Sequence, residues 1–140
     1  MHQTSSRYIK GKNYELLLAR KLVNYGFFVV RAPASGRRGK KLRYVDVIAI
    51  KSGRVLLFEV RYFKKLVTIY IPKNVYEKLR RARDVTGGEA YFALYIGELK
   101  EWRFIPIDKV QEQTDKYVKI GIDMLRSGYK VTDIVYGRVK

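Results

Sequence analysis

Residues 44–63 read YVDVIAIKSGRVLLFEVRYF and hold two apolar runs, 44–51 and 54–63, on either side of Ser52 and Gly53. Two turn residues between two such runs are typical of a β-hairpin. Both runs are rich in valine, isoleucine, leucine and aromatic residues, which favour strands. The stretch therefore predicts two adjacent antiparallel strands joined by a tight turn.

The register of this hairpin places two acids opposite each other. If Ser52 and Gly53 form the turn, Lys51 pairs with Arg54, paired residue numbers sum to 105, and Asp46 lies opposite Glu59. Opposed Cβ atoms lie about 5 Å apart, and like charges at that distance destabilise a sheet. Side chains alternate along a strand, so Arg61 lies on the same face as Glu59.

Either of two cations could relieve this repulsion. Mg²⁺ or Mn²⁺ prefers hard oxygen ligands, typically one or two carboxylates completed by water and a substrate phosphate. Alternatively, Arg61 could bridge both acids as a structural ion pair. The residue types favour the two about equally, and a register shift of one residue would move Asp46 to the other face.

Helical spacing of apolar residues predicts one helix over residues 12–25, ended by Gly26, and a second over residues 72–86, ended by Gly87. The side of the second helix that is expected to face inward carries Val75, Leu79 and Ala82. Its outer side is expected to carry Lys73, Lys78, Arg80, Arg81 and Arg83.

Further strands are predicted at residues 27–31, 67–71, 90–96 and 102–107. From Lys109 onward the pattern is ambiguous, although Thr132 could cap a short final helix. The elements together predict an α/β fold, with one domain over residues 1–140 and a mixed central sheet flanked by helices.

The charge balance indicates a polyanionic partner. Thirty Lys plus Arg against thirteen Asp plus Glu give the 140-residue chain a formal charge of +17. Nucleic acid is favoured over a membrane surface because no basic amphipathic helix dominates the sequence. The chain has no cysteine and one histidine, so carboxylates, Lys, Arg and hydroxyls must do any chemistry. No apolar run could span a membrane and no signal core begins the chain, so a cytoplasmic protein is expected.

The hairpin also resembles a known motif. Asp46 on one strand and Glu59-Val60-Arg61 on the next resemble the core of the PD-(D/E)xK nuclease superfamily, which implies a restriction-endonuclease-like fold. A wider pattern is similar to the archaeal Holliday junction resolvases over about residues 8–110, with residues 111–140 unmatched. This likeness is carried by Lys10-Gly11, Glu15, residues 26–36, the basic run 37–43, residues 53–59 and 69–71, Ala82-Arg83, Gly87-Gly88 and residues 104–106.

The resemblance implies a homodimeric endonuclease that depends on Mg²⁺ (or Mn²⁺) and nicks two opposed strands of a four-way DNA junction. Glu15, Asp46 and Glu59 match the acidic positions of the family and would hold the metal. Arg61 stands where the family has a catalytic lysine, and Ser35 matches a serine on a mobile loop. Arg31 matches a basic residue near the scissile phosphate.

Basic side chains around these positions are expected to bind DNA. The run 37–43 has five cations and no acid, and it lies between Ser35 and Asp46. Contacts to phosphates carry no base information, so recognition by DNA shape and charge is expected. The expected DNA-binding residues are Lys10, Lys12, Arg31, Arg37, Arg38, Lys40, Lys41, Arg43, Lys64 and Lys65.

Four positions depart from the family pattern: Val45 replaces a proline, Leu16 an arginine, Val75 a glutamine and Arg61 a lysine. Arginine stays charged and cannot act as a proton donor, so the last exchange is not conservative. The alternative is a catalytically weak or inactive relative that binds junctions, as a scaffold or as a heterodimer with an active paralogue. An RNA-binding protein is a third hypothesis, which the charge permits but which explains neither the opposed acids nor the shared pattern.

Overall fold

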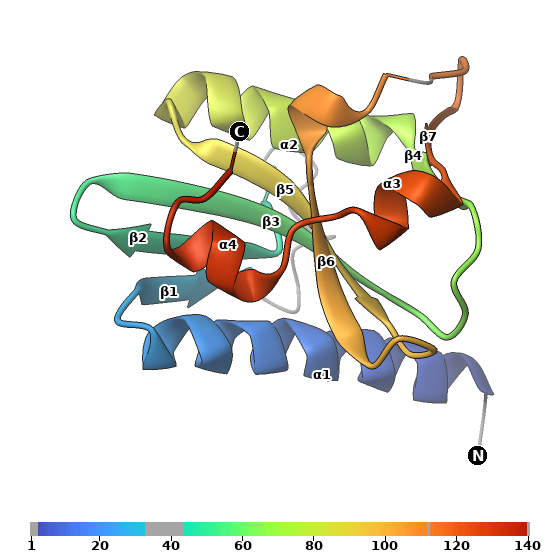
Figure 1. The fold of residues 1–140 in the computed structure, drawn as a ribbon, viewed down its shortest axis with the longest axis horizontal. Coiled ribbons are helices and arrows are strands. Elements are labelled where there is room, and N and C mark those ends of the chain that lie inside the picture. The colour runs from blue at the N-terminus through green and yellow to red at the C-terminus, as the bar shows by residue number, and fades with distance from the viewer. Residues whose placement is uncertain (1–2, 33–43, 112, 140) are drawn as a thin grey trace.

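The computed structural model describes residues 3–32, 44–111 and 113–139, with side chains from residue 13 onward in the first of these segments. Figure 1 shows a central sheet with α1 along one side and α2 along the other. The elements are α1 (Gln3–Asn24), β1 (Phe28–Arg31), β2 (Val47–Lys51), β3 (Arg54–Phe63), β4 (Ile69–Pro72), α2 (Lys73–Thr86), β5 (Glu89–Ile96), β6 (Glu101–Pro106), a 3₁₀ turn η2 (Ile107–Lys109), β7 (Tyr117–Ile120), α3 (Ile122–Arg126) and α4 (Val131–Val135).

The main sheet has the strand order β1-β2-β3-β5-β6. Strand β3 pairs with β5 in parallel, whereas the other neighbouring pairs are antiparallel, so the sheet is mixed as expected. Lys51 pairs with Arg54, which confirms the predicted register of the hairpin. Ser52 and Gly53 both have positive φ, 48° and 83°, as the favoured two-residue hairpin turn requires.

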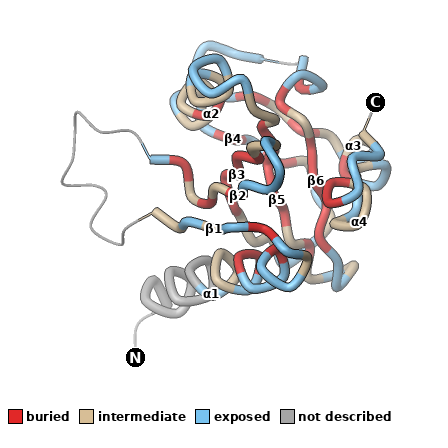
Figure 2. Tube along the Cα trace, turned by 90° about the vertical axis from the view of Figure 1, so that its left-hand side faces the viewer, coloured by how far each residue is buried: buried red, intermediate tan, exposed pale blue. Residues whose placement is uncertain are grey.

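Helix α1 covers one face of this sheet. Leu18 and Leu22 of α1 are fully buried in a cluster that includes Phe58 of β3 and Phe104 of β6. Ile134 of α4 belongs to the same cluster, so the C-terminal helix packs on this face as well. Figure 2 shows the strands between α1 and α2, with the buried residues concentrated there.

Helix α2 covers the opposite face and forms part of the connection between the parallel strands β3 and β5. Leu79 is fully buried in a cluster with Leu57 and Phe92, and Val75 and Ala82 pack against that cluster. The inward-facing side that the sequence predicted is therefore confirmed for these apolar residues. The helix ends at Gly87, whose φ of 71° is the left-handed conformation that favours glycine.

The chain after residue 110 adds elements to both faces of the main sheet. Strand β7 pairs with β4 in a separate two-stranded sheet. Val118 and Ile120 of β7, and Leu125 of α3, are fully buried in the cluster on the α2 side. The C-terminal residues thus supply part of the core, although their pattern alone did not define their structure.

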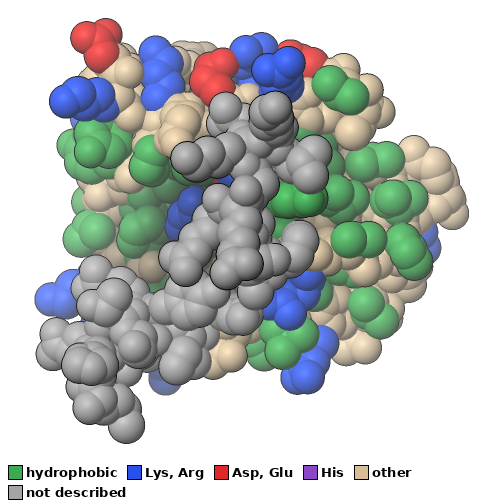
Figure 3. All heavy atoms as spheres, turned by 180° about the vertical axis from the view of Figure 1, so that it is seen from behind, with side chains coloured by type: hydrophobic (Ala, Val, Ile, Leu, Met, Phe, Trp, Pro, Cys, Tyr) green, Lys and Arg blue, Asp and Glu red, His purple; other side chains and the backbone are tan. Residues whose placement is uncertain are grey.

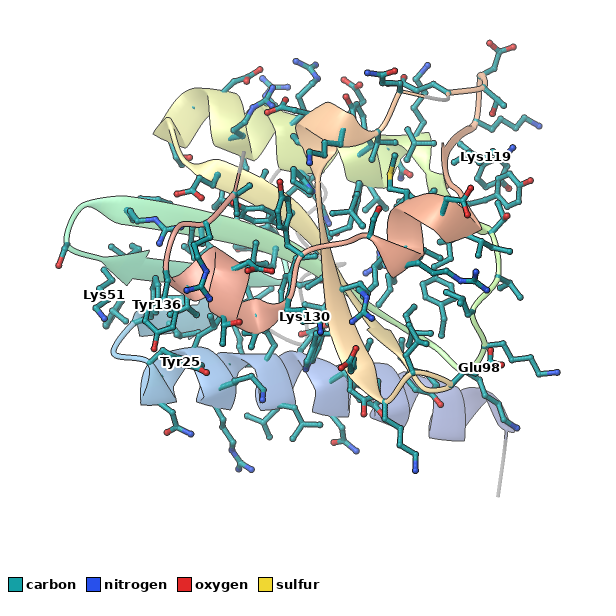
Figure 4. The ribbon with its side chains drawn as sticks, viewed as in Figure 1. Tyr25, Lys51, Glu98, Lys119, Lys130 and Tyr136 are labelled. Atoms are coloured by element: carbon teal, nitrogen blue, oxygen red, sulfur yellow. The ribbon has the colours of Figure 1, made fainter. Side chains whose placement is uncertain are left out.

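Arg54 ties α4 to the hairpin. Its guanidinium donates two hydrogen bonds to the carboxylate of Glu89, at 2.9 and 3.0 Å. It also donates to the carbonyl oxygens of Ile134 at 2.9 Å and Val135 at 3.0 Å. Beside this contact the rings of Tyr136 and Tyr25 meet edge to face, and Figure 4 shows both near the end of α1.

Several boundaries differ from the predictions. Helix α1 begins at Gln3 rather than at residue 12. It continues through Gly11, because a single glycine inside a helix costs only about 1 kcal/mol of helix stability. Strand β2 begins at Val47 rather than at residue 44, because the N–H of Asp46 bonds the side chain of Glu59 instead. Lys130 rather than Thr132 precedes α4. Among the described residues, no helix is long and apolar enough to cross a membrane.

Candidate active site

Asp46 and Glu59 meet where the pairing of β2 with β3 ends. The side chain of Glu59 is 1% exposed, and its Oε2 accepts a hydrogen bond from the backbone N–H of Asp46 at 2.9 Å. In return, Oδ2 of Asp46 accepts a hydrogen bond from the N–H of Val60 at 2.8 Å. Each carboxylate therefore accepts a hydrogen bond from a backbone N–H group at the point where the pairing of β2 with β3 ends. These bonds fix both acids relative to the backbone.

Arg61 reaches both acids. Its Nη1 donates to Oδ2 of Asp46 at 3.1 Å and to the carbonyl oxygen of Val60 at 2.8 Å. Its Nη2 lies 3.8 Å from Oε1 of Glu59. The ion pair considered from the sequence is thus present, but the guanidinium is bound more closely to Asp46 than to Glu59.

The nearest described cation to Glu59 comes from α2. Nζ of Lys78 lies 2.9 Å from Oε1 of Glu59, so the prediction that Lys78 faces outward is wrong. Lys78 is three residues after Val75 and four before Ala82, which places it on the inward stripe of the helix. Charged residues are rarely buried without a partner, and the sequence did not reveal that Glu59 is the partner. The helical spacing was the signal that could have found this residue.

Glu15 adds a third acid from α1. Its Oε1 lies 3.8 Å from Nη2 of Arg31, at the end of β1. The following residue, Ala32, donates its N–H to the carbonyl oxygen of Asp46 at 2.9 Å, so the end of β1 lies beside Asp46. The three acids, from one helix and the hairpin, thus each have a cation close by: Arg31, Arg61 and Lys78.

Two of these carboxyl groups have raised pKa values. Burial raises the pKa of Glu15 to about 7, and the negative charge of Asp46 adds to the effect against the opposing charge of Arg31. Burial likewise raises the pKa of Glu59 above its usual range, again with help from Asp46, although Lys78 and Arg61 oppose it. The three neighbouring cations therefore do not fully compensate the acids at this end of the sheet.

The donor set suits a hard divalent cation. In the described part of the chain no three acids are gathered into a ready metal-binding cluster. However, Oε1 of Glu59 is buried and has no backbone donor among the described residues; its close contact is with the ammonium of Lys78, at 2.9 Å. Carboxylate oxygens of this kind are the ligands that Mg²⁺ and Mn²⁺ prefer. Asp46 and Glu59, with Glu15 beside them, therefore fit such an ion.

Some of the other predicted site residues lie in the described part of the chain and others do not. Lys64 and Lys65 are exposed, in the connection between β3 and β4. Arg31 is close to Glu15 and is only 29% exposed. Lys10 and Lys12 lie in α1, but their side chains are outside the described part. The remaining predicted residues lie outside the described residues altogether: Ser35, Arg37, Arg38, Lys40, Lys41 and Arg43.

The surface behind the view of Figure 1 carries charges of both signs. Figure 3 shows Lys and Arg side chains among Asp and Glu along the edge formed by α2. Arg80 pairs with Glu77 and Asp84, and Arg83 pairs with Asp84 and Asp108. The pairs within α2 lie on its outer side, and the pair with Asp108 joins α2 to η2. Ion pairs at the surface contribute little to stability.

A mixed sheet whose central hairpin carries Asp46 and Glu59-Val60-Arg61, with Glu15 on a packed helix, defines a domain of the restriction-endonuclease-like class. The comparisons with known proteins narrow this class. The sequence matches the family described as archaeal Holliday junction resolvase (Hjc) over residues 6–138. The chain belongs to this family.

Relatives and a solved structure agree with this assignment. The chain is 32% identical over 126 residues to the crossover junction endodeoxyribonuclease Hjc of Sulfurisphaera tokodaii, covering 90% of this chain and 85% of that protein. It is 37% identical over 94 residues to the Hjc of Methanocaldococcus jannaschii, covering 66% of this chain and 65% of that protein. The structure of Archaeoglobus fulgidus Hjc, a Holliday junction resolvase, superposes with a TM-score of 0.77 at 26% identity, covering 91% of this chain and 96% of that one.

Proposed function

We propose that this protein is a structure-selective endodeoxyribonuclease that resolves four-way DNA junctions by metal-dependent hydrolysis. Family membership and the names of the relatives support the substrate and the reaction. The observation that carries the proposal is the pair of mutually anchored acids, Asp46 and Glu59, beside Arg61. Carboxylate oxygens fixed side by side in this way are the ligands that a hard divalent cation prefers.

In this proposal Asp46, Glu59 and Glu15 would hold Mg²⁺ or Mn²⁺, which when bound would supply an activated water and neutralise charge on the phosphate. The hydrogen bonds from the N–H groups of Asp46 and Val60 keep the two hairpin acids in fixed positions. Arg61 stabilises negative charge on the phosphoryl group, since its guanidinium is a permanent cation. It does not donate a proton to the leaving oxygen.

The positive charge of the chain supports DNA as the substrate. A formal charge of +17 favours binding to phosphates, and the exposed Lys64 and Lys65 add to it close to the end of β3. A homodimer with two-fold symmetry would present two sites to a junction of similar symmetry, which accounts for paired nicks. Chromosomal or viral DNA as substrate would place the protein in the cytoplasm.

A labelled four-way junction incubated with the protein and Mg²⁺ or Mn²⁺ tests the proposal. Symmetric paired nicks are expected from the wild type. Asp46→Asn and Glu59→Gln should still bind the junction but should not cut it, whereas Asp115→Asn, which changes an exposed acid, should cut normally. Binding by the wild type without nicking in either metal would reject the hydrolytic activity.

One observation favours a second candidate, a junction-binding relative with weak or no activity. The guanidinium of Arg61 is 3.1 Å from Asp46 and takes up charge that a metal would otherwise neutralise. Such a protein would act as a scaffold or as a heterodimer with an active paralogue. It predicts junction affinity that EDTA does not change, and mixed oligomers when the chain is combined with an active relative.

A further inference from the structure

The two oxygens of Glu59 have different environments. Oε2 accepts the N–H of Asp46 and is held in place by the backbone. Oε1 faces the two side-chain cations, Lys78 at 2.9 Å and Arg61 at 3.8 Å. Oε2 has one lone pair taken by this bond, whereas Oε1 has no backbone donor among the described residues, so Oε1 is the more open oxygen for a metal ion. Lys78 therefore lies on the oxygen that a metal ion would approach most readily.

Lys78 and Arg61 are held in different ways. Arg61 is anchored by the carbonyl oxygen of Val60 at 2.8 Å as well as by Asp46. Among the described residues, the ammonium of Lys78 contacts Glu59 and no other acid. Its side chain is 22% exposed, so it is not sealed from solvent. A lysine has four flexible methylenes, so its ammonium can move several ångströms while α2 stays in place.

We propose that Lys78 fills the place of the metal ion in the metal-free protein and moves to a DNA phosphate when the ion binds. The inference rests on the proposed function, because it assumes that a divalent cation binds Asp46 and Glu59. Two cations cannot share one carboxylate oxygen at close range without strong repulsion, so the bound ion displaces the ammonium. The displaced ammonium would then pair with a DNA phosphate bound at the same site.

This role differs from that of a structural ion pair. A purely structural Lys78 would stay on Glu59 whether or not a metal is present. The proposed Lys78 is a positioning residue without metal and a phosphate-binding residue with it. With metal bound, Lys78 would supply an ammonium from α2 to the DNA phosphate, in a site where the cation of the hairpin is the guanidinium of Arg61.

Reaction of lysine amines with a small acylating reagent, read by mass spectrometry of the wild type, tests the movement directly. Lys78 should react slowly in EDTA and about fivefold or more faster with Mn²⁺, because the ion displaces it from Glu59. It should react slowly again with Ca²⁺ and a four-way junction, because a phosphate then binds its ammonium. The exposed Lys100 should react at the same rate in EDTA and in Mn²⁺. In Asp46→Asn, the effect of Mn²⁺ on Lys78 should disappear.

Calorimetry of Mn²⁺ binding without DNA gives a second measurement. Lys78→Met should bind Mn²⁺ about fivefold tighter than the matched control Arg81→Met, which removes an exposed cation of the same helix. Lys78→Arg should bind about as the wild type does. Unchanged reactivity of Lys78 in saturating Mn²⁺, or equal Mn²⁺ affinity of Lys78→Met and Arg81→Met, would overturn the inference.

The outcomes separate this inference from the proposed function. If Lys78 responds to Mn²⁺ but the wild type does not cut junctions, the inference holds and the hydrolytic activity fails. If junctions are cut but Lys78 does not respond to bound metal, only the inference fails. If calorimetry detects no bound Mn²⁺ in the absence of DNA, the inference fails, because Lys78 then has nothing to give way to, and the cutting assay alone decides the proposed function.

Discussion

The carboxylate of Glu59 accepts the backbone N–H of Asp46 at 2.9 Å, at the point where β2 stops pairing with β3. The reverse bond, from the N–H of Val60 to Oδ2 of Asp46, is 2.8 Å long. The two acids that repel each other are thus fixed by each other's strands. Their positions are set by the fold, and a metal ion is not required to bring them together.

Asp46 should therefore have a role in stability that its charge does not explain. Asp46→Ala leaves the N–H of Val60 without its acceptor, which should cost about 1–3 kcal/mol of unfolding free energy. Asp46→Asn retains an oxygen for this bond and should lose clearly less. Urea denaturation of both variants in EDTA measures the difference, and equal losses would show that the bond is unimportant for stability.

Glu15 should make the metal-free protein less stable as the pH rises. Its pKa is about 7 in the folded chain against a reference value of 4.5, so the folded state binds more protons between these values. The contribution to stability is fully present below pH 4.5 and is lost as the pH rises through 7. Denaturation of the wild type and Glu15→Gln from pH 5 to 8 should show a steeper decline for the wild type. Parallel profiles would contradict the raised pKa.

Tyr14 should position the acid next to it in α1. Its ring stacks on Tyr62 of β3 at 4.7 Å and on Tyr95 of β5 at 4.5 Å between centroids. Tyr14→Leu loses both stacks, which should lower the unfolding free energy by about 1–3 kcal/mol. Because Glu15 is the adjacent residue, we expect the single-turnover cutting rate to fall more than junction affinity does.

Tyr136→Leu is the matched control for this prediction. Tyr136 is 61% exposed and touches one ring, that of Tyr25, far along the chain from the acids. This variant should cut and bind junctions as the wild type does. If both tyrosine variants lose cutting to the same extent, the stack on the sheet does not position Glu15.

Arg54 should control the stability of the C-terminal helix. Its guanidinium donates to Ile134 and Val135 as well as to Glu89, and hydrogen bonds to charged groups contribute about 1.5–3 kcal/mol each. Arg54→Met should raise the amide hydrogen exchange of α4 more than that of β3. Arg54→Lys, which lacks the planar fork, should restore little of this protection. Equal protection of α4 in wild type and Arg54→Met would contradict the assigned role.

The hairpin was predictable because it depends on local rules. A two-residue turn fixes the register, and the register places Asp46 next to Glu59, as the structure confirms. The contact of Lys78 with Glu59 joins residues from different elements, and only the packing of α2 over the sheet brings them together. The same limit applies to β7, where Val118 and Ile120 alternate with Tyr117 and Lys119 over only four residues, too few to define a strand until β4 lies beside them. The roles of Ser35 and of the basic run 37–43 stay predictions.

The pairing of β7 with β4 has a practical consequence for anyone who shortens this protein. A polypeptide that stopped at residue 110 would leave β4 as an open edge and would strip Ile69 and Ile71 of their apolar neighbours Val118 and Ile120. Exposed edges of this kind recruit other chains into aggregates. The segment after residue 110 therefore protects the edge of β4 and part of the core, and expression trials should retain it.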